Sequence, residues 1–212
     1  MIVAGYEPVS LIDYPGHISS IAFLYGCNLR CRYCHNPHLV VGSLPPDRRV
    51  DFIDYLARSE IEYVVITGGE PLYSNQIIDF IKEIKTESPL KIKLDTNGFF
   101  PLALERLLEK ELIDFVSMDV KAFNQEDLQF ITRRRVQLET FYRSLACLTA
   151  ARIPFELRYT QWKIYSAREI NQFRKSVGGY PLKFQSLREN CPLLDKRFKP
   201  LFADQGNPIN QV

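Results

Sequence analysis

The sequence predicts an α/β fold built around a parallel sheet. Short runs rich in β-branched and aromatic residues alternate along the 212 residues with longer amphipathic stretches. We expect strands at residues 19–25, 63–67, 91–95, 115–119, 155–160 and 182–185. We expect helices between them, at residues 48–58, 75–87, 102–110, 138–151 and 167–176. This regular alternation indicates consecutive βα units, which form either an open doubly wound sheet or a partial barrel.

Individual elements carry the patterns that these assignments require. The first strand contains the apolar run Ile-Ala-Phe-Leu-Tyr at residues 21–25, and the second contains Val-Val-Ile at residues 64–66. The third helix presents four leucines at the i, i+3, i+4 and i+8 positions of one buried face, namely Leu104, Leu107, Leu108 and Leu112. No Gly-x-Gly-x-x-Gly turn follows the first strand, which argues against a dinucleotide-binding sheet.

Composition sets the domain organisation and excludes several classes of partner. With 46% hydrophobic residues and no repeat or linker, the chain is expected to form one domain over residues 1–212, with a polar tail at 201–212 that frays. A net charge of +2 is too small to indicate a nucleic-acid partner. No apolar run approaches the roughly 20 residues that span a bilayer, and no signal peptide is evident at the N-terminus.

Cysteine usage is the most informative feature of the chain. Three of the five cysteines, Cys27, Cys31 and Cys34, follow the first strand with the spacing C-x3-C-x2-C. This pattern does not match a secreted disulfide framework, so we expect a reducing cytoplasm. Iron–sulfur clusters usually have four cysteine ligands, and a set of three leaves one iron open for chemistry.

Two other interpretations of the cysteine loop are weaker. The last two cysteines alone form a C-x-x-C redox pair, but Cys27 would then be superfluous. With His35 or His38 the three cysteines would form a Cys3His zinc set, although zinc sites more usually take paired ligands from two separated segments. The sequence therefore favours an iron–sulfur cluster.

Further polar motifs follow the next three expected strands. They are Gly68-Gly69-Glu70, Asp95-Thr96-Asn97-Gly98 and Asp119-Val120-Lys121. Because the carboxyl ends of parallel strands meet at one edge, where ligand sites gather, we expect these motifs and the cysteine loop to form one composite site. Asp119 and Lys121 are two residues apart on a strand and share a face, so burying them is costly unless they are paired or bound to a ligand.

These residues resemble a known superfamily. The cysteine spacing, with Tyr33 just before the third cysteine, is similar to that of radical S-adenosylmethionine (SAM) enzymes. The extension Cys34-His35-Asn36-Pro37 and the opening at residues 10–16 resemble activating enzymes of glycyl-radical proteins, closest to those of anaerobic ribonucleoside-triphosphate reductase. The resemblance continues to about residue 160 and implies a partial (β/α)6 barrel of the TIM type, a [4Fe–4S] cluster and SAM.

The resemblance also implies roles for individual residues. The three cysteines would hold the catalytic cluster, and SAM would chelate the fourth iron. Tyr33 would lie near the adenine, or alternatively pack over the loop. The GGE motif, residues 68–70, would bind the ammonium group of SAM, and a simple turn is the alternative.

Five positions on or next to later strands complete the implied site. Lys121 and Arg158 are SAM-binding candidates, although the segment at 160–163 departs from the family pattern after Arg158. Asp95, Thr96 and Asp119 match a site that holds a monovalent cation near the SAM carboxylate. An internal salt bridge between Asp119 and Lys121 is the alternative interpretation.

The expected function is a radical SAM activase that acts on a protein substrate. Its partner would be a glycyl-radical enzyme, first anaerobic ribonucleoside-triphosphate reductase and second pyruvate formate-lyase, and its electron donor a flavodoxin or ferredoxin. The alternatives are a small-molecule enzyme of the 7-deazaguanine-forming type and a zinc-stabilised binding module. The basic run Arg133-Arg134-Arg135 is either a solvated helix end or a docking patch for an acidic protein surface.

Overall fold

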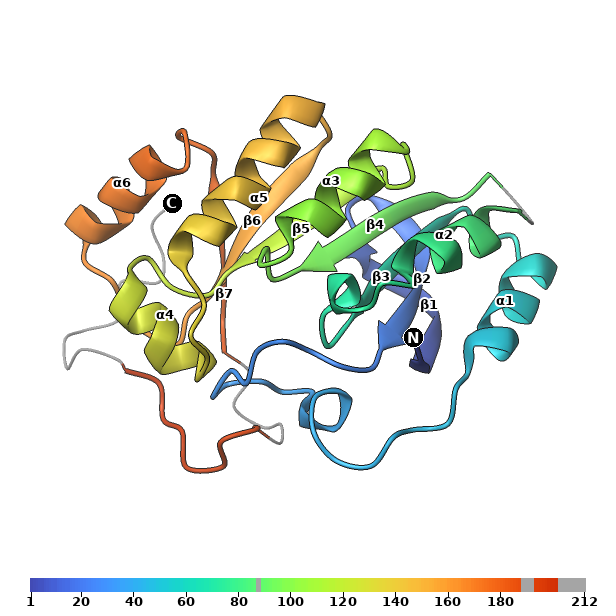
Figure 1. Ribbon diagram of the computed structural model, residues 1–212, viewed down its shortest axis with the longest axis horizontal. Coiled ribbons are helices and arrows are strands. Elements are labelled where there is room, and N and C mark those ends of the chain that lie inside the picture. Colours follow the sequence, from blue (N-terminus) through green and yellow to red (C-terminus); the bar gives the residue numbers. More distant parts are fainter. Residues whose placement is uncertain (87–88, 188–192, 202–212) are drawn as a thin grey trace.

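The computed structural model describes residues 1–86, 89–187 and 193–201 and contains one seven-stranded sheet (Figure 1). Six strands run parallel in chain order: β2 (His17–Leu24), β3 (Tyr63–Gly68), β4 (Lys91–Thr96), β5 (Phe115–Val120), β6 (Phe155–Thr160) and β7 (Leu182–Gln185). Strand β1 (Val3–Tyr14) pairs antiparallel with β2 and forms the other edge. In the described residues no pairing joins β7 to β1, so the predicted partial (β/α)6 barrel is confirmed as an open one.

Helices connect the parallel strands, as the alternating pattern predicts. They are α1 (Arg49–Arg58), α2 (Ile77–Thr86), α3 (Pro101–Glu109), α4 (Gln125–Thr132), α5 (Leu138–Ala151) and α6 (Ala167–Ser176). Two short 3-10 helices, η1 (Pro37–Leu39) and η2 (Pro71–Tyr73), follow β2 and β3. Figure 1 shows α2, α3 and α5 lying over one face of the sheet. No helix in the described ranges is long and apolar enough to cross a bilayer.

Two elements, β1 and α4, were not expected from the sequence. Strand β1 contains Gly5 and Pro8, lacks a clean alternation of buried and exposed residues, and pairs with β2 through three register shifts. Helix α4 is only 8 residues long, and its Asn124 cap accepts a hydrogen bond from the Asp127 amide. Both elements depend on their neighbours for stability, because short or irregular segments form few local interactions. The predicted fraying of the tail concerns residues 202–212, which lie outside the described part.

The two faces of the sheet differ. The face under the helices is apolar and contributes Ile66, Leu94, Met118 and Leu157 to the main core. The opposite, inner face is divided into two halves. Around β1–β3 it is also apolar, with a second cluster of Tyr14, Ile21 and Val65. Around β4–β6 it carries charged residues instead, so only this half of the inner face is polar. These residues are Lys93, Asp95, Asp119, Glu156 and Arg158.

Candidate active site

The cysteine loop after β2 is held mainly through its backbone. We use the name cluster loop for residues 26–39. The amides of Arg30 and Arg32 donate to the carbonyl oxygens of the last two residues of α4, at 3.0 and 2.9 Å. The amide of Gly26 donates to the carbonyl of Leu39 at 2.8 Å, which closes the loop on itself. Figure 1 shows the chain leaving β2 and running beneath the sheet toward α4. The position of Cys31 is therefore fixed by the hydrogen bonds of its two neighbours, Arg30 and Arg32.

The three thiols are shielded from solvent to different extents. Cys31 is buried, and Cys27 and Cys34 are half-buried. The Cys34 amide donates to the Cys31 carbonyl at 3.1 Å, and the Leu29 amide donates to Cys27 Sγ at 3.3 Å. Burial raises the pKa of Cys27 to about 12 and that of Cys31 to about 11. Such thiols become thiolates when a metal centre supplies positive charge, so the loop suits a metal cluster.

In the part of the chain that the structure describes, no three His, Cys, Asp or Glu side chains converge on a point where a single metal ion would bind. A [4Fe–4S] cluster binds each cysteine through a different iron, so its ligands need not converge in this way. The three cysteine thiols of the cluster loop match such a cluster.

The paired glycines after β3 pack against the start of the cluster loop. A Cβ on Gly68 would lie 2.3 Å from the Leu24 nitrogen, and one on Gly69 would lie 2.1 Å from the Gly26 oxygen. The amide of Glu70 donates to that same Gly26 oxygen at 2.8 Å. The close approach that these glycines permit is therefore made by the chain's own backbone, which ties the turn after β3 to the loop after β2.

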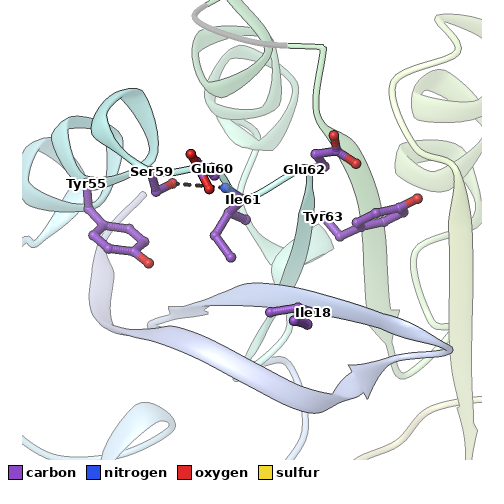
Figure 2. Close-up of a pocket in the computed structure, with 7 residues that line it drawn as sticks. All are labelled: Ile18, Tyr55, Ser59, Glu60, Ile61, Glu62 and Tyr63. Carbon is purple, nitrogen blue, oxygen red and sulfur yellow. Dashed lines mark hydrogen bonds between the residues drawn. The ribbon is translucent and has the colours of Figure 1, made fainter.

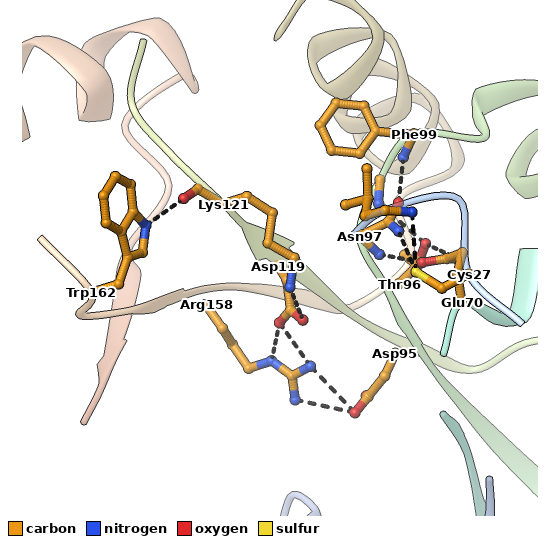
Figure 3. A network of polar contacts seen from close by, with 12 residues as sticks. Cys27, Glu70, Asp95, Thr96, Asn97, Phe99, Asp119, Lys121, Arg158 and Trp162 are labelled. Atoms are coloured by element: carbon orange, nitrogen blue, oxygen red, sulfur yellow. Dashed lines mark hydrogen bonds and ion pairs between the residues drawn. The ribbon is translucent and has the colours of Figure 1, made fainter. Parts of the chain in front are cut away.

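The Glu70 side chain is buried and joins this turn to the next one. Its Oε1 accepts hydrogen bonds from the Leu72 amide at 3.1 Å and from Thr96 Oγ1 at 2.7 Å. Its Oε2 accepts one from the Asn97 amide at 2.7 Å. Burial raises the pKa of this carboxyl to about 7, although the three hydrogen bonds favour the charged form. These contacts support a positioning role for Glu70 in which its carboxylate orients the loop after β4 (Figure 3).

Asn97 belongs to a motif that the sequence places in the site, but the sequence assigns it no role of its own. Its Nδ2 donates to Asn28 Oδ1 in the cluster loop at 2.8 Å and lies 4.0 Å from Cys27 Sγ. The Asn97 backbone amide donates to the Glu70 carboxylate. Asn97 therefore connects the turn after β4 to the loop that carries the cysteines. The signal that could have identified it is an Asn-Gly turn directly after a buried strand, at the edge where ligand sites gather.

Charged side chains of β4, β5 and β6 meet on the inner face. The guanidinium of Arg158 contacts Asp119 Oδ1 at 2.9 Å and Asp95 Oδ2 at 3.3 Å (Figure 3). Lys121 Nζ donates to Asp119 Oδ2 at 3.1 Å, and Lys93 pairs with Asp95 Oδ1. Burial alone would raise the pKa of Asp119, but Arg158 and Lys121 outweigh it and lower that pKa to about 2. We call these five residues the inner ladder. It contains the Asp119–Lys121 salt bridge that the sequence offered as the alternative interpretation.

Tyr33 and Lys121 link the ladder to the cluster loop. Lys121 Nζ lies 5.7 Å from the centroid of the buried Tyr33 ring. The Tyr33 hydroxyl is buried, and apart from the nearby Lys121 ammonium it has no hydrogen-bond partner among the described residues. The backbone of Lys121 is fixed because Trp162 Nε1 donates to its carbonyl at 2.7 Å. A buried donor without a partner beside an ammonium group is what a polar ligand would satisfy.

The segment at residues 193–201 returns to the cluster loop, which no sequence pattern indicates. The Leu194 amide donates to the Cys34 carbonyl at 2.9 Å, and the Asp195 amide donates to the Arg32 carbonyl at 3.1 Å. The Arg32 and Asp195 side chains form an ion pair at 2.6 Å. This segment braces the outer side of the loop.

A hollow of about 410 Å³ lies near the starts of β2 and β3, at the opposite end of these strands from the cluster loop (Figure 2). Its lining residues are Ile18, Tyr55, Ser59, Glu60, Ile61, Glu62 and Tyr63. None of the residues expected in the site contributes to it. All the described site residues instead gather at the carboxyl ends of the strands, as the motifs predict.

An open α/β barrel with three cysteines on the loop after its first parallel strand defines the class of cluster-dependent barrel enzymes. The model of the radical SAM superfamily matches residues 21–176, and the chain belongs to this superfamily. The family implies a [4Fe–4S] cluster and SAM. The three enclosed thiols fit the cluster, and the unpartnered Tyr33 hydroxyl beside Lys121 fits a polar ligand such as SAM.

Relatives of known or provisional function differ in how much of this chain they match. The chain is 29% identical to a protein of Methanocaldococcus jannaschii whose assignment as a glycyl-radical enzyme activating enzyme is provisional, over 100% of this chain and 90% of that protein. It is 38% identical to the 7-carboxy-7-deazaguanine synthase of Methanothermobacter thermautotrophicus, over 45% of this chain and 38% of that protein. It is 30% identical to the GTP 3′,8-cyclase of Moorella thermoacetica, over 76% and 52%.

Solved structures share the fold. Streptococcus suis SuiB bound to the precursor peptide SuiA has a TM-score of 0.65 at 14% identity, over 86% of this chain and 41% of that one. The enzyme anSMEcpe with bound AdoMet has a TM-score of 0.62 at 16% identity, over 86% and 52%. The chain spans about half the length of these neighbours or less, and the likeness concerns the fold alone.

Proposed function

We propose that this radical SAM enzyme generates a glycyl radical on a partner protein. The observation that carries the proposal is the full-length similarity to the Methanocaldococcus jannaschii protein, together with the Cys34-His35-Asn36-Pro37 extension of the cluster loop. Matches to the synthase and cyclase relatives cover smaller parts of the chain and of the relatives. Similarity along nearly the whole of both chains supports shared chemistry more strongly than similarity in a common segment.

The residues of the site take distinct parts in this chemistry. Cys27, Cys31 and Cys34 would hold the cluster, which when bound supplies one electron to break the C5′–S bond of SAM, giving methionine and a 5′-deoxyadenosyl radical. A glycine Cα of the partner would give up a hydrogen atom to this radical, leaving a glycyl radical and 5′-deoxyadenosine. Tyr33 of the cluster loop and Lys121 beside it would contact SAM.

Hydrogen bonds and ion pairs with neighbouring residues would hold the cluster loop and Lys121 in place. Glu70 and Asn97 would orient the edge of the loop beside Cys27, because their hydrogen bonds connect both turns to it. Gly68 and Gly69 would allow the close backbone approach that this connection needs. Arg158 would act through Asp119, which in turn positions Lys121. Precise positioning matters because hydrogen transfer requires the reacting atoms to be held close together.

The partner that we favour is anaerobic ribonucleoside-triphosphate reductase, with pyruvate formate-lyase as the second choice. The support is the resemblance of residues 10–16 and of the cluster loop to the activators of the reductase. A flavodoxin or ferredoxin in a reducing cytoplasm would supply the electron. The exposed run Arg133-Arg134-Arg135 follows α4, whose last carbonyls hold the cluster loop, and it would attract an acidic protein surface.

A small-molecule substrate is the second candidate function. The specific observation in its favour is the 38% identity to a 7-carboxy-7-deazaguanine synthase over 100 residues. A small-molecule enzyme needs no protein partner for turnover of its substrate, whereas an activase consumes SAM productively only with its partner. The two candidates therefore differ in what must be present for a stable product to form.

Anaerobic reconstitution with iron and sulfide tests the proposal. We expect the loaded enzyme with SAM, dithionite and the reductase to give 5′-deoxyadenosine and a glycyl-radical doublet in the EPR spectrum of the reductase. When the reductase carries deuterated glycine, the product should contain deuterium. A loaded enzyme that does not cleave SAM would defeat the catalytic claim, and cleavage without a radical on any glycyl-radical partner would defeat the substrate assignment.

The cluster ligands have a direct control within the chain. Cys31→Ala should reduce bound iron severely, because each cysteine anchors a separate iron. Cys147→Ala changes a free cysteine in α5 and should leave iron content unchanged. Full iron content in the Cys31 variant would refute the ligand assignment.

A further inference from the structure

Every carboxylate oxygen of the expected cation site already has a cationic partner. Asp95 Oδ1 pairs with Lys93, and Asp95 Oδ2 lies 3.3 Å from the Arg158 guanidinium. Asp119 Oδ1 lies 2.9 Å from Arg158, and Asp119 Oδ2 lies 3.1 Å from Lys121 Nζ. The third member of the expected set, Thr96, donates its hydroxyl to Glu70. The residues that would bind a metal cation are therefore engaged with side chains of the chain itself.

The charge balance also disfavours a bound cation. The inner ladder has three positive side chains, Lys93, Lys121 and Arg158, and two negative ones, so its formal charge is already +1. Another cation would therefore meet no excess of negative charge in the ladder, and every oxygen of Asp95 and Asp119 already has a cationic partner. A bound alkali metal ion needs several oxygen ligands at short range. The structure therefore does not fit the monovalent cation that the family resemblance implies.

We propose that Lys93 and Arg158 take the place of this cation, and that the enzyme binds SAM without an alkali metal ion. Lys93 is buried on the inner face of β4, with 2% of its side chain exposed. Among the residues that the structure describes, its one ion pair is with Asp95. An ammonium group donates hydrogen bonds to a carboxylate and carries the same charge as a potassium or sodium ion.

The strand register explains how Lys93 acts at a distance. Asp119 of β5 lies directly opposite Arg158 of β6, so their contact is fixed by strand pairing. Arg158 also reaches Asp95, and the unbroken series runs Lys93, Asp95, Arg158, Asp119, Lys121. Removing the first cation leaves Asp95 to attract Arg158 more strongly, which loosens Asp119 and then Lys121 beside Tyr33. Lys93 is thus a positioning residue for SAM binding, independent of which substrate receives the radical.

The test measures SAM affinity by equilibrium dialysis on cluster-loaded protein in potassium, sodium or tetramethylammonium buffer. For the parent protein we expect dissociation constants that agree within about twofold in all three buffers, because no alkali ion is needed. Lys93→Met should bind SAM at least tenfold more weakly in tetramethylammonium, and potassium or sodium should restore part of the loss. Lys93→Arg, which keeps the charge, should stay closer to the parent.

Lys183→Met is the matched control. Lys183 lies on β7, pairs with Glu156 at 3.6 Å and is outside the inner ladder, so its removal should leave the buffer dependence unchanged. Sodium-23 NMR of the cluster-free protein is a second measurement and detects bound sodium directly. We expect the sodium line to broaden with Lys93→Met and not with the parent. A parent that requires potassium or sodium for SAM binding would overturn the proposal. So would a folded Lys93→Met protein that equals the parent in tetramethylammonium. Neither result depends on the glycyl-radical partner.

Discussion

The cluster loop and the inner ladder lie on neighbouring parts of one site but are held in place by different forces. The cluster loop is positioned by backbone groups, which nearly any residue carries. Its contacts with α4, with the turn after β3 and with residues 194–195 use mainly amides and carbonyls, and the Arg32 side chain adds contacts to Phe130 and Asp195. The inner ladder is positioned by five side chains whose charges alternate in sign.

This difference determines which substitutions each region tolerates. A loop held through its backbone should tolerate substitution of most of its side chains. The exceptions are the cysteines and any position where a larger side chain would separate backbone atoms that are in close contact. A ladder of buried ion pairs depends on each member, because losing one partner leaves a charge without compensation in an enclosed place. Substitutions that reach the backbone of the loop, or a single charge of the ladder, should therefore have the largest effects.

The largest effect is expected for Gly69→Ala, which breaks a backbone contact in the loop region. The added Cβ would lie 2.1 Å from the Gly26 oxygen, so the turn after β3 must move away from the cluster loop. We expect the free energy of unfolding to fall by about 3 kcal/mol and bound iron to fall several-fold. Urea unfolding and iron analysis measure the two quantities. Gly5→Ala, where nothing lies within 4 Å of the new Cβ, should change neither. Equal stability and iron content in both variants would contradict the backbone account.

A smaller effect is expected for Asp119→Asn, which removes one charge from the ladder. The pKa of Asp119 is lowered from 3.8 to about 2, so its charged form contributes about 2 kcal/mol of stability at neutral pH. Because the native pKa is the lower one, this contribution is complete above pH 4 and is lost as the pH falls through about 2. The difference in unfolding free energy between parent and variant should therefore shrink below pH 4.

Urea unfolding of the cluster-free protein at a series of pH values checks this prediction. Asp51→Asn, at an exposed pair with Arg48, serves as the control and should change stability by less than about 0.5 kcal/mol. A difference between Asp119→Asn and the parent that stays constant from pH 7 to pH 3 would show that the charge of Asp119 is not what stabilises the ladder.

The smallest effect is expected for Arg32→Gln, although Arg32 lies next to a cluster ligand. Its side chain pairs with Asp195 and lies 4.6 Å from the Phe130 ring centroid, but 30% of it is exposed. Such pairs contribute about 1 kcal/mol or less. The backbone amide that holds the loop is retained in glutamine, so iron content after reconstitution should equal that of the parent. A marked loss of iron would mean that side chains also hold the loop.

Much of the fold was predictable from local patterns. All six parallel strands and five of the helices lie within one or two residues of their predicted bounds, because periodic burial is visible in a short window of sequence. Strand β1 and helix α4 were missed because their stability comes from β2 and from the cluster loop, respectively. The expected gathering of motifs at one edge is confirmed by contacts that connect Glu70, Asn97 and the cluster loop.

The sequence by itself determined the strand and helix order, the three closely spaced cysteines and the superfamily, because all of these follow from spacing along the chain. Tertiary structure alone decided which charges compensate one another across strands. Asp95, Asp119 and Arg158 meet because strand pairing brings β4, β5 and β6 together, and Asp195 reaches Arg32 from 163 residues away. Partners so far apart in sequence leave no local pattern. The expected cation site therefore became an internal ion-pair ladder only when the strands were placed side by side.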